Sequence, residues 1–225
     1  MPIDYSKYPF DLRIRHHVSP NLYFPLEQQK IQDNTSYPPL VSEINWSEYF
    51  ANSNLPNVLD IGCGMGKFLL DYSVENSNDN ILGIEVRKNP VNWIKSVIEG
   101  EKLPNVNVLW YSVVNRINFI ESNSIDKIFY FFPDPWFKEK HKKRRAFKKE
   151  FVEDCIRVLK PNGTLYLQTD IEDVHQYQTF ILEEFEKSNQ IKLYTPTEWL
   201  FPITDKEEHC IRKNFKYWRI CATKL

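Results

Sequence analysis

Hydrophobic and polar positions follow two different periods along most of the chain. Short continuous apolar runs, such as residues 57–62 (NVLDIG) and 125–132 (IDKIFYFF), are typical of strands that are buried on both faces. Longer segments whose apolar residues recur at helical spacing are typical of amphipathic helices. These patterns predict strands over 57–62, 80–86, 106–113, 125–132, 164–170 and 215–224, and helices over 40–50, 66–76, 89–100, 146–160 and 174–188.

The predicted helices and strands largely alternate from residue 40 onward. Such alternation favours a mostly parallel sheet with helices on both faces, which is a doubly wound, Rossmann-like α/β fold. Residues 1–38 do not follow the pattern, because they are rich in proline and tyrosine and include a basic cluster of Arg13, Arg15, His16 and His17. We expect these residues to form an irregular N-terminal arm, followed by one α/β domain over residues 39–225.

The composition narrows the class of protein. A chain of 225 residues, 42% of them hydrophobic, suits one domain with a full core. The formal net charge of −1 gives no positive field over the whole molecule. The chain has no apolar run long enough for a membrane span and no convincing signal sequence at its start. Neither the histidines nor the cysteines have metal-ligand spacing, so we expect a cytoplasmic protein without a metal, with reduced thiols at Cys63, Cys155, Cys210 and Cys221.

The first predicted strand leads into a glycine-rich turn, LDIGCGMGKF. Sheets of this kind bind ligands at the carboxyl ends of their strands, and Gly62, Gly64 and Gly66 would let the backbone approach a ligand closely. Lys67 stands where a dinucleotide fingerprint would have a glycine. Asp60 precedes the turn, and a carboxylate is a poor neighbour for pyrophosphate but a good one for a cationic ligand.

The second strand ends at Glu85, which follows the glycine turn by about 19 residues, the spacing of an acid that binds ribose. A carboxylate at this place can accept hydrogen bonds from both hydroxyls of an adenosine ribose. Asp60 near a positive centre and Glu85 on a ribose together indicate S-adenosylmethionine, whose sulfonium is positive and which carries no phosphate.

The fourth strand ends in Pro133-Asp134-Pro135-Trp136, beside the glycine turn. The two prolines fix the backbone on either side of Asp134 and end the hydrogen bonding of the strand. We therefore expect Asp134 to project rigidly into the ligand crevice, with Trp136 as an aromatic wall.

Residues 138–149, KEKHKKRRAFKK, hold eight lysines and arginines with one glutamate. On a nearly neutral chain this segment is a concentrated positive field beside the predicted cofactor crevice. Such a segment would neutralise phosphates and hold a polynucleotide over the reacting centre. The side chains that we expect to contact a nucleic-acid backbone are His141, Lys142, Lys143, Arg144 and Arg145.

These motifs together resemble the bacterial tRNA (guanine-N7)-methyltransferase family over nearly the whole chain. The resemblance rests on LDIGCGMGKFLL, LGIEVR, FFPDPWFKEKHKKRR, LKPNGTLYLQTD and TDKEEHCIRKNFKYWRI, and the segment RIRHHVSPN resembles the N-terminal arm of cyanobacterial-type members. The resemblance implies a class I methyltransferase that transfers a methyl group from S-adenosylmethionine to N7 of guanine in tRNA. The guanine that it implies lies at position 46, in the variable loop.

The resemblance also implies roles for single residues. Asp60 and Glu85 match acids that bind the methyl donor, and Asp134 matches an aspartate shared between donor and guanine. Lys138 and Asp170 match substrate contacts. A T-x-x-E element would close over the guanine, and we place it at Thr204, Asp205, Lys206 and Glu207 rather than at the second candidate, Thr197-Glu198.

Two positions depart from the family pattern. Ser112 stands where the family usually has an aspartate or asparagine that contacts the adenine, and a serine has a shorter reach. His209 and Asn214 replace the arginine and glycine that usually follow the T-x-x-E element. The first departure bears on cofactor affinity and the second on the geometry of the lid.

Three other functions remain open at this stage. A methyltransferase acting on an exocyclic amine, such as N6 of adenine, would usually have two prolines after its polar residue, whereas here Pro133 precedes Asp134. A non-catalytic RNA-binding subunit with a methyltransferase fold is favoured by Ser112 alone. A small-molecule methyltransferase would not need the basic segment. We expect a monomer or a homodimer.

Overall fold

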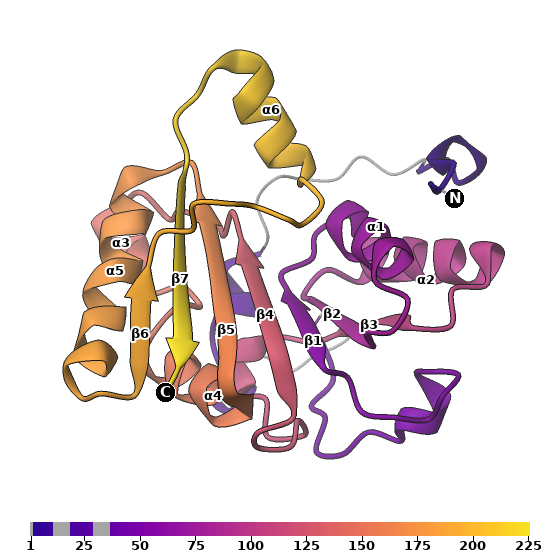
Figure 1. Ribbon diagram of the computed structural model, residues 1–225, viewed down its shortest axis with the longest axis horizontal. Coiled ribbons are helices and arrows are strands. Elements are labelled where there is room, and N and C mark those ends of the chain that lie inside the picture. Colours follow the sequence, from indigo (N-terminus) through magenta and orange to yellow (C-terminus); the bar gives the residue numbers. More distant parts are fainter. Residues whose placement is uncertain (1, 11–18, 29–36) are drawn as a thin grey trace.

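Seven strands form one sheet in the order β3-β2-β1-β4-β5-β7-β6 (Figure 1). The computed structural model describes residues 2–10, 19–28 and 37–225. Strand β7 is antiparallel to both of its neighbours, and the other paired strands are parallel. The predicted α/β fold is therefore confirmed, with strands β1 Val58–Ile61, β2 Ile81–Glu85, β3 Val106–Trp110, β4 Ile125–Phe131, β5 Leu159–Thr169, β6 Ile191–Tyr194 and β7 Trp218–Lys224.

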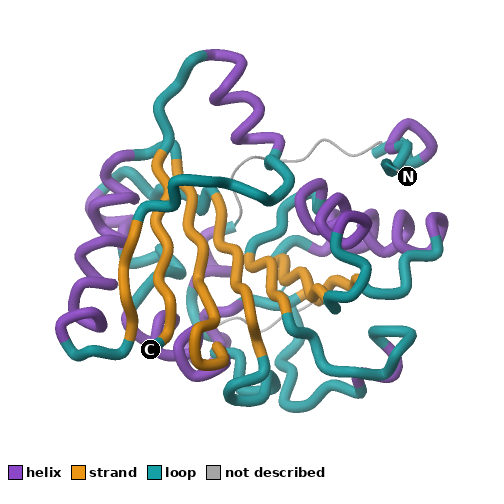
Figure 2. The backbone as a smooth tube through the Cα atoms, viewed as in Figure 1, coloured by secondary structure: helices purple, strands orange, loops and turns teal. Residues whose placement is uncertain are grey.

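Helices cover both faces of this sheet (Figure 2). One apolar core lies between the sheet and helices α4 and α5, and the other lies between the sheet and helices α1 and α2. Neighbouring residues of a strand alternate between the two cores, because successive side chains point to opposite faces. The helices are α1 Lys67–Glu75, α2 Lys88–Glu101, α3 Glu139–Lys142, α4 Lys149–Val158, α5 Glu172–Lys187 and α6 Asp205–Lys213.

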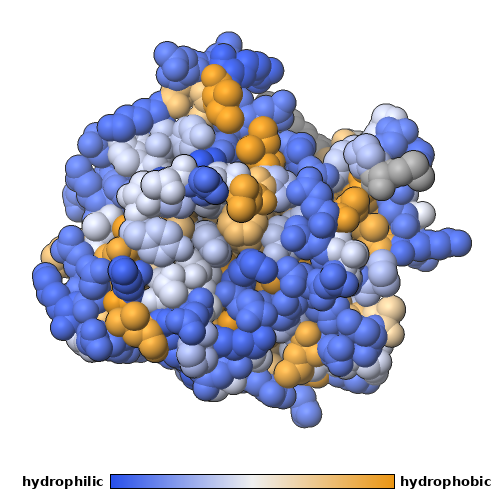
Figure 3. Space-filling model, in the orientation of Figure 1, coloured by the Kyte–Doolittle hydropathy of each residue, from blue (hydrophilic) through white to orange (hydrophobic). Residues whose placement is uncertain are grey.

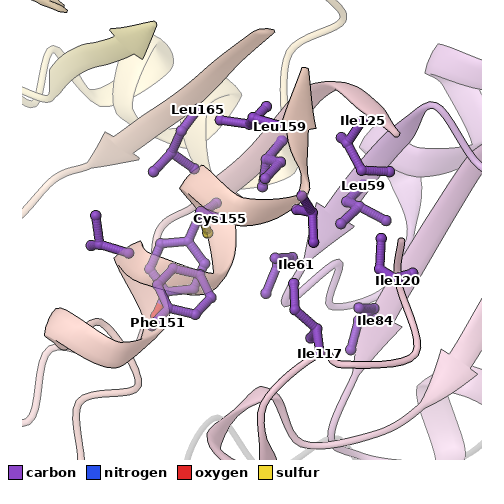
Figure 4. Close-up of a cluster of buried hydrophobic side chains, with 14 of the residues drawn as sticks. Leu59, Ile61, Ile84, Ile117, Ile120, Ile125, Phe151, Cys155, Leu159 and Leu165 are labelled. Carbon is purple, nitrogen blue, oxygen red and sulfur yellow. The ribbon is translucent and has the colours of Figure 1, made fainter. Parts of the chain in front are cut away.

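The core on the α4 and α5 side shows why the apolar runs became strands (Figure 4). Leu59 and Ile61 of β1 and Ile84 of β2 point into it, and Phe151 and Cys155 of α4 pack over them. All five side chains are buried. Burying a side chain of this size stabilises the fold by about 1.5–3 kcal/mol, so this face is strongly specified by the sequence.

The structure corrects three boundaries. The helix predicted over 40–50 is reduced to a single 3-10 turn, Trp46–Glu48, because Asn45 caps this turn with its own side chain, accepting from the amide of Ser47. The strand predicted to reach residue 113 ends at Trp110. The helix predicted to reach residue 160 ends at Val158, and the following residues, including Asn162 with a φ of 66°, already belong to β5.

Two described segments of the N-terminal arm contact the domain, and both contain only 3-10 turns. In residues 2–10, the hydroxyl of Tyr5 donates to Asp71 on α1 (2.7 Å) and the hydroxyl of Tyr8 donates to Glu101 on α2 (2.9 Å). Residues 19–28 lie instead at the carboxyl edge of the sheet. The basic cluster of Arg13, Arg15, His16 and His17 lies outside the described residues, and the domain boundary near residue 38 stays a prediction.

The described residues bear on the expectations about thiols, metal sites and membrane-spanning helices. All four cysteines carry free thiols, three of them buried. No group of three or more histidine, cysteine, aspartate or glutamate side chains in residues 2–10, 19–28 and 37–225 is placed to hold a metal ion. The same residues form no helix that is long and apolar enough to cross a membrane. The face seen in Figure 3 is mostly hydrophilic, with hydrophobic residues scattered over it.

Candidate active site

A cavity of about 610 Å³ opens at the carboxyl ends of β1 and β4, which are neighbours in the sheet. The chain leaves these two strands toward opposite faces, and such a switch point is where doubly wound sheets bind ligands. The volume suits a cofactor of nucleotide size. The lining includes predicted site residues from six parts of the chain, namely Asp60, Gly62, Gly64, Gly66, Glu85, Ser112, Asp134, Asp170, Thr204, Asp205 and Lys206.

The glycine turn forms one wall of the cavity. Gly62, Gly64 and Gly66 have φ values of 76°, 61° and 77°, in the left-handed region that favours glycine. The amide of Gly62 donates to Ile84 (2.7 Å), which holds the turn against β2. The amide of Gly64 donates to the carboxylate of Glu85 (2.9 Å). The turn is thus positioned by the second strand and by its terminal acid.

Gly66 and Gly62 should respond differently to alanine. A Cβ on Gly66 would lie 2.7 Å from Ile94 of α2, whereas a Cβ on Gly62 would meet nothing within 4 Å. Both substitutions force alanine into a left-handed conformation, which costs about 1–2 kcal/mol. Overpacking adds about 1–3 kcal/mol for Gly66→Ala alone. Urea unfolding should therefore show a clearly lower free energy of unfolding for Gly66→Ala than for Gly62→Ala, and equal losses would contradict this packing.

Asp60 is a buried carboxylate that is not fully satisfied within the protein. Its side chain is 3% exposed, and its Oδ2 has no hydrogen-bond partner among the described residues. Desolvation, together with the negative charge of Glu85, raises the pKa of Asp60 to about 8. A buried carboxylate of this kind, in the lining of a cavity, favours a positively charged ligand. The sulfonium and ammonium groups of S-adenosylmethionine meet this requirement.

The raised pKa of Asp60 predicts a pH dependence of cofactor binding. In the free protein the carboxyl is neutral below its pKa of about 8, so its attraction for a cation grows as the pH rises. The affinity for S-adenosylmethionine should increase about tenfold between pH 6.5 and pH 8.5. Asp60→Asn should remove most of this increase in calorimetric titrations. A wild-type affinity that falls over the same range would contradict the assignment.

The same shift lowers the stability of the ligand-free fold at high pH. Because the pKa of Asp60 is raised from 3.8 to about 8, its stabilising contribution is fully present below about pH 3.8 and is lost as the pH rises through about 8. A bound cation compensates this loss.

Glu85 is placed in the cavity but is already engaged. Its side chain accepts from the amide and from Nε of Arg87 (2.9 and 2.8 Å), in addition to the amide of Gly64. Sequence reasoning did not identify Arg87, although it stands two residues after the acid. A ribose at Glu85 would therefore share this carboxylate with Arg87.

Ser112 lies in the cavity wall, and its hydroxyl donates to the main-chain carbonyl of Leu22 in the N-terminal arm (2.8 Å). The sequence alone indicates this hydroxyl only as a contact for the adenine. The hydrogen bond that Ser112 donates connects residues 19–28 to the loop that follows β3. Leu22 and Tyr23 of the arm consequently line the cavity as well.

Asp134 stands on a strained loop at the end of β4. Phe132 and Trp136, on either side of the proline-bracketed aspartate, have φ values of 46° and 44°. Non-glycine residues held in this region cost about 1–3 kcal/mol each and cluster at functional sites. Asp134 lines the same cavity as Asp60 and Glu85. Its Oδ2 accepts a hydrogen bond from the hydroxyl of Tyr23.

Trp136 does not line the cavity, contrary to the aromatic wall that we expect from the sequence, and lies between an aromatic and a cationic neighbour. The ring of Tyr23 meets it edge to face, with centroids 5.0 Å apart, and the guanidinium of Arg144 lies 5.0 Å from its centroid. Its Nε1 is buried and has no partner among the described residues. Tyr23 was not identified from the sequence, because it lies in an arm without periodicity.

Arg145 does not lie where the sequence placed it. We expected a contact to backbone phosphate, but the side chain is 4% exposed. Its Nε and Nη2 donate to the carbonyl of Pro135 (3.0 and 2.8 Å), it pairs with Asp173 at the start of α5, and its guanidinium lies over the ring of Tyr177. The hydrogen bond from Arg145 is the main cause of a lowered pKa of Asp173. Arg145 is therefore a positioning residue for the loop of Asp134.

The cations between residues 138 and 144 lie near the surface and do not line the cavity, so Lys138 is outside the position that we expect for a substrate contact. We call Lys138, Lys140, Lys142, Lys143 and Arg144 the basic rim. Lys142 pairs with Glu139 and Asp173 (2.6 and 3.2 Å). Desolvation and the neighbouring cations lower the pKa of His141.

The T-x-x-E element forms the N-terminus of α6, which lies beyond the carboxyl ends of β4 and β5 (Figure 1). The hydroxyl of Thr204 accepts from the amide of Glu207 (3.0 Å), which caps the helix. Lys206 pairs with Asp170 (2.7 Å), across the mouth of the cavity.

Glu207 itself is not a lining residue of the cavity, contrary to its expected role as a substrate contact. Its carboxylate is buried, accepts from Gln168 (3.1 Å) and pairs with Arg219, so it holds α6 to the sheet. Asn214 ends α6 with a φ of 55°, a left-handed conformation that asparagine tolerates, which explains why it can replace the glycine of the family. Thr197 and Glu198 do not line the cavity.

A pocket for a cationic nucleoside at the switch point of this sheet defines a class I methyltransferase that uses S-adenosylmethionine. Residues 54–220 match the family model described as a putative methyltransferase. The chain belongs to the bacterial tRNA (guanine-N7)-methyltransferase family. It is 30% identical over 184 residues to the tRNA (guanine-N7)-methyltransferase of Prochlorococcus marinus (strain MIT 9515), which covers 76% of this chain and 87% of the relative. The enzyme of the same name from Streptococcus pneumoniae (strain Hungary19A-6) is 28% identical, over 65% of this chain and 69% of the relative.

Solved structures support the fold. The aminoglycoside resistance methyltransferase NpmB1 superposes with a TM-score of 0.53 at 17% identity, over 75% of this chain and 86% of that one. A methyltransferase dependent on S-adenosylmethionine from Aquifex aeolicus gives a TM-score of 0.51 at 21% identity, over 75% and 81% of the two chains.

Proposed function

We propose that this enzyme transfers a methyl group from S-adenosylmethionine to N7 of a guanine in tRNA, the guanine at position 46 of the variable loop. The observation that carries the proposal is the shared cavity of Asp60 and Asp134. A buried carboxylate suited to a cation and a rigid carboxylate suited to a base line the same space, beside the basic rim. The names of the relatives agree with this substrate. We also propose a cytoplasmic location, where tRNA is available and free thiols persist.

The cofactor would be held by residues of the first two strands. Gly62, Gly64 and Gly66 leave room for its close approach, Asp60 offers its unpaired oxygen to a positive group, and Glu85 offers acceptors to the ribose hydroxyls. When bound, S-adenosylmethionine supplies an electrophilic methyl group on a sulfonium.

Asp134 would orient the guanine rather than remove a proton. N7 of guanine carries a lone pair and no proton at neutral pH. The bond from N7 to the methyl carbon can therefore form without a general base, while the bond from sulfur to that carbon breaks and its electron pair stays on the neutral thioether. The purine becomes positively charged in the reaction, and the carboxylate of Asp134 favours that charge. Positioning of this kind can lower a barrier by up to about 7–11 kcal/mol. Pro133 and Pro135 restrict the backbone on either side of Asp134, which limits the movement of the carboxylate.

The basic rim would bind the tRNA backbone, with the target base unstacked from its neighbours. Sequence-specific recognition of RNA relies on splayed bases that stack on aromatic side chains. Trp136 follows Asp134 by two residues, lies between Tyr23 and Arg144, and would provide such a surface. Lys206 and Asp170 lie at the mouth of the same cavity, so α6 would close over the base.

Neutralising part of the basic rim should weaken tRNA binding in a salt-dependent way. Each phosphate contact contributes about 0.7–0.9 to the slope of log affinity against log salt. The double variant Lys143→Gln/Arg144→Gln should therefore reduce this slope by about one to two units in filter-binding titrations. The matched control Lys187→Gln/Lys192→Gln lies near the opposite edge of the sheet, at the end of α5 and the start of β6. A slope that changes equally in both variants would remove the rim from the interface.

Mass spectrometry of tRNA nucleosides tests the proposed activity. Unmodified tRNA is incubated with the purified protein and a donor that carries a deuterated methyl group, then digested to nucleosides. We expect labelled 7-methylguanosine. Labelled N6-methyladenosine would establish the exocyclic-amine alternative, and tRNA binding without any labelled nucleoside would establish the non-catalytic one.

A further inference from the structure

Tyr23 of the N-terminal arm contacts both side chains that the proposed function assigns to the guanine. Its hydroxyl donates to Oδ2 of Asp134, and its ring meets the ring of Trp136 edge to face, with an angle of 82° between the planes. The hydrogen bond joins residues that are 111 positions apart in the sequence. The arm thus reaches the reacting end of the cavity with one aromatic side chain.

The neighbours of Tyr23 hold it in this place from both sides. On one side, the carbonyl of Leu22 accepts from Ser112 (2.8 Å). On the other, the carbonyl of Phe24 accepts from the hydroxyl of Tyr37 (2.9 Å). The amide of Leu26 donates to Oδ1 of Asn115, in the loop after β3 (2.9 Å). The segment is therefore a strap with several anchors, and the contacts of Tyr23 form part of it.

A tyrosine and a guanine offer similar groups to this site. Tyrosine presents an O–H donor on a flat ring, and guanine presents N–H donors on the edge of a flat ring. Oδ2 of Asp134 already accepts from the phenol, and the ring of Trp136 is already in edge-to-face contact with the ring of Tyr23. A guanine that used the same two side chains would have to replace both contacts.

We propose that Tyr23 occupies the guanine position in the free enzyme and that the target base displaces it. This inference rests on the proposed function. A base displaces Tyr23 when it can donate to Asp134 and pack against Trp136 in place of the phenol. Guanine presents two adjacent donors, N1–H and the N2 amine, to the carboxylate. Adenine presents one donor, the N6 amine, beside the N1 acceptor, which repels the carboxylate, so it replaces Tyr23 less well.

Displacing Tyr23 costs free energy only when a tRNA inserts its base into the cavity. The apparent affinity for a ligand falls by the fraction of protein that is open to it. Contacts between phosphate and the basic rim do not require Tyr23 to move. Removal of the Tyr23 hydroxyl should therefore strengthen the binding of a tRNA that inserts its guanine, and should not affect a tRNA that binds through its backbone alone.

The test is equilibrium binding of two tRNAs to protein saturated with S-adenosylhomocysteine, so that no methyl transfer is needed for the readout. One tRNA carries the variable-loop guanine, and the other carries adenine in its place. Tyr23→Phe should bind the guanine-containing tRNA about 5- to 20-fold more tightly than wild type does, because a hydrogen bond to a charged acceptor is lost. Binding of the adenine-containing tRNA should be unchanged.

Tyr8→Phe is the matched control, because it also removes an arm hydroxyl that donates to a carboxylate, that of Glu101, on α2. It should change neither affinity. In protein that also carries Asp134→Ala, Tyr23→Phe should have no further effect, since the acceptor is gone.

Two results would overturn the inference. Tyr23→Phe with wild-type affinity for both tRNAs would show that Tyr23 does not compete with the base. Wild-type affinity combined with a lower kcat would assign it to positioning Asp134 instead. A failure of the proposed function looks different, because wild-type protein would then bind both tRNAs equally and form no 7-methylguanosine.

Discussion

Replacing Asp134 with alanine should lower the rate of methyl transfer to tRNA by about a thousandfold, near the upper end of what one preorganised charged group contributes. The cavity, the basic rim and the other acids remain in this variant. Affinity for tRNA should therefore stay within about fivefold of wild type, because the phosphate contacts supply most of the binding energy. Single-turnover rates and filter binding on the same preparations measure the two effects separately.

The variant Asp134→Asn refines this prediction. Asparagine keeps the size of the side chain and one acceptor oxygen but loses the negative charge. Its rate should fall between those of wild type and Asp134→Ala, because it can still orient the base but no longer favours the positive purine. Turnover near the wild-type rate in either variant would remove Asp134 from the reaction.

Arg145→Gln should have the second largest effect, on both stability and rate. The guanidinium is buried, donates twice to the carbonyl of Pro135 and pairs with Asp173. Removing one partner of a buried pair costs about 3–5 kcal/mol, and we expect somewhat less because Asp173 is half exposed. Without this tie the loop that carries Asp134 loosens, and kcat should fall by about a hundredfold, as for misplaced reacting groups.

Arg144→Gln is the control, since Arg144 is the neighbouring cation of the basic rim. It should reduce the salt dependence of tRNA binding and lower the free energy of unfolding by only about 0.5–1 kcal/mol, the contribution of its contact with the ring of Trp136. Arg145→Gln should instead lower the free energy of unfolding and leave the salt dependence of tRNA binding unchanged. Its kcat is measured at a temperature where the variant is fully folded. A reduced salt slope with unchanged stability in Arg145→Gln would restore the phosphate contact that the sequence suggested.

The sequence predicted most of the sheet because its strands are continuous apolar runs, and β4 is the strongest of them. It did not reveal α6, whose segment DKEEHCIRK is mostly polar and buries only Glu207 and Cys210. The short strand β6 lacked a clear pattern for the same reason, since only Ile191 of its residues is buried. The helix expected over 40–50 failed because a local cap by Asn45 outweighed a weak apolar period.

The candidate site could be predicted where it depends on strand ends. Asp60, Glu85 and Asp134 share one cavity because parallel strands bring their carboxyl ends to one edge of the sheet. The contact of Tyr23 could not be predicted, because it joins the arm to β4 across a long stretch of chain. A run of charges likewise does not show which member turns inward, and Arg145 does so beside the buried Phe147.

The atom that receives the methyl group is the centre of this account, and one altered substrate tests it directly. A tRNA with 7-deazaguanosine at the variable-loop position keeps the hydrogen-bonding edge of guanine but has a carbon in place of N7. With labelled donor, we predict that this tRNA binds as tightly as its normal counterpart and acquires no methyl group at that nucleotide. Transfer to the altered nucleotide at the normal rate would contradict methylation at N7.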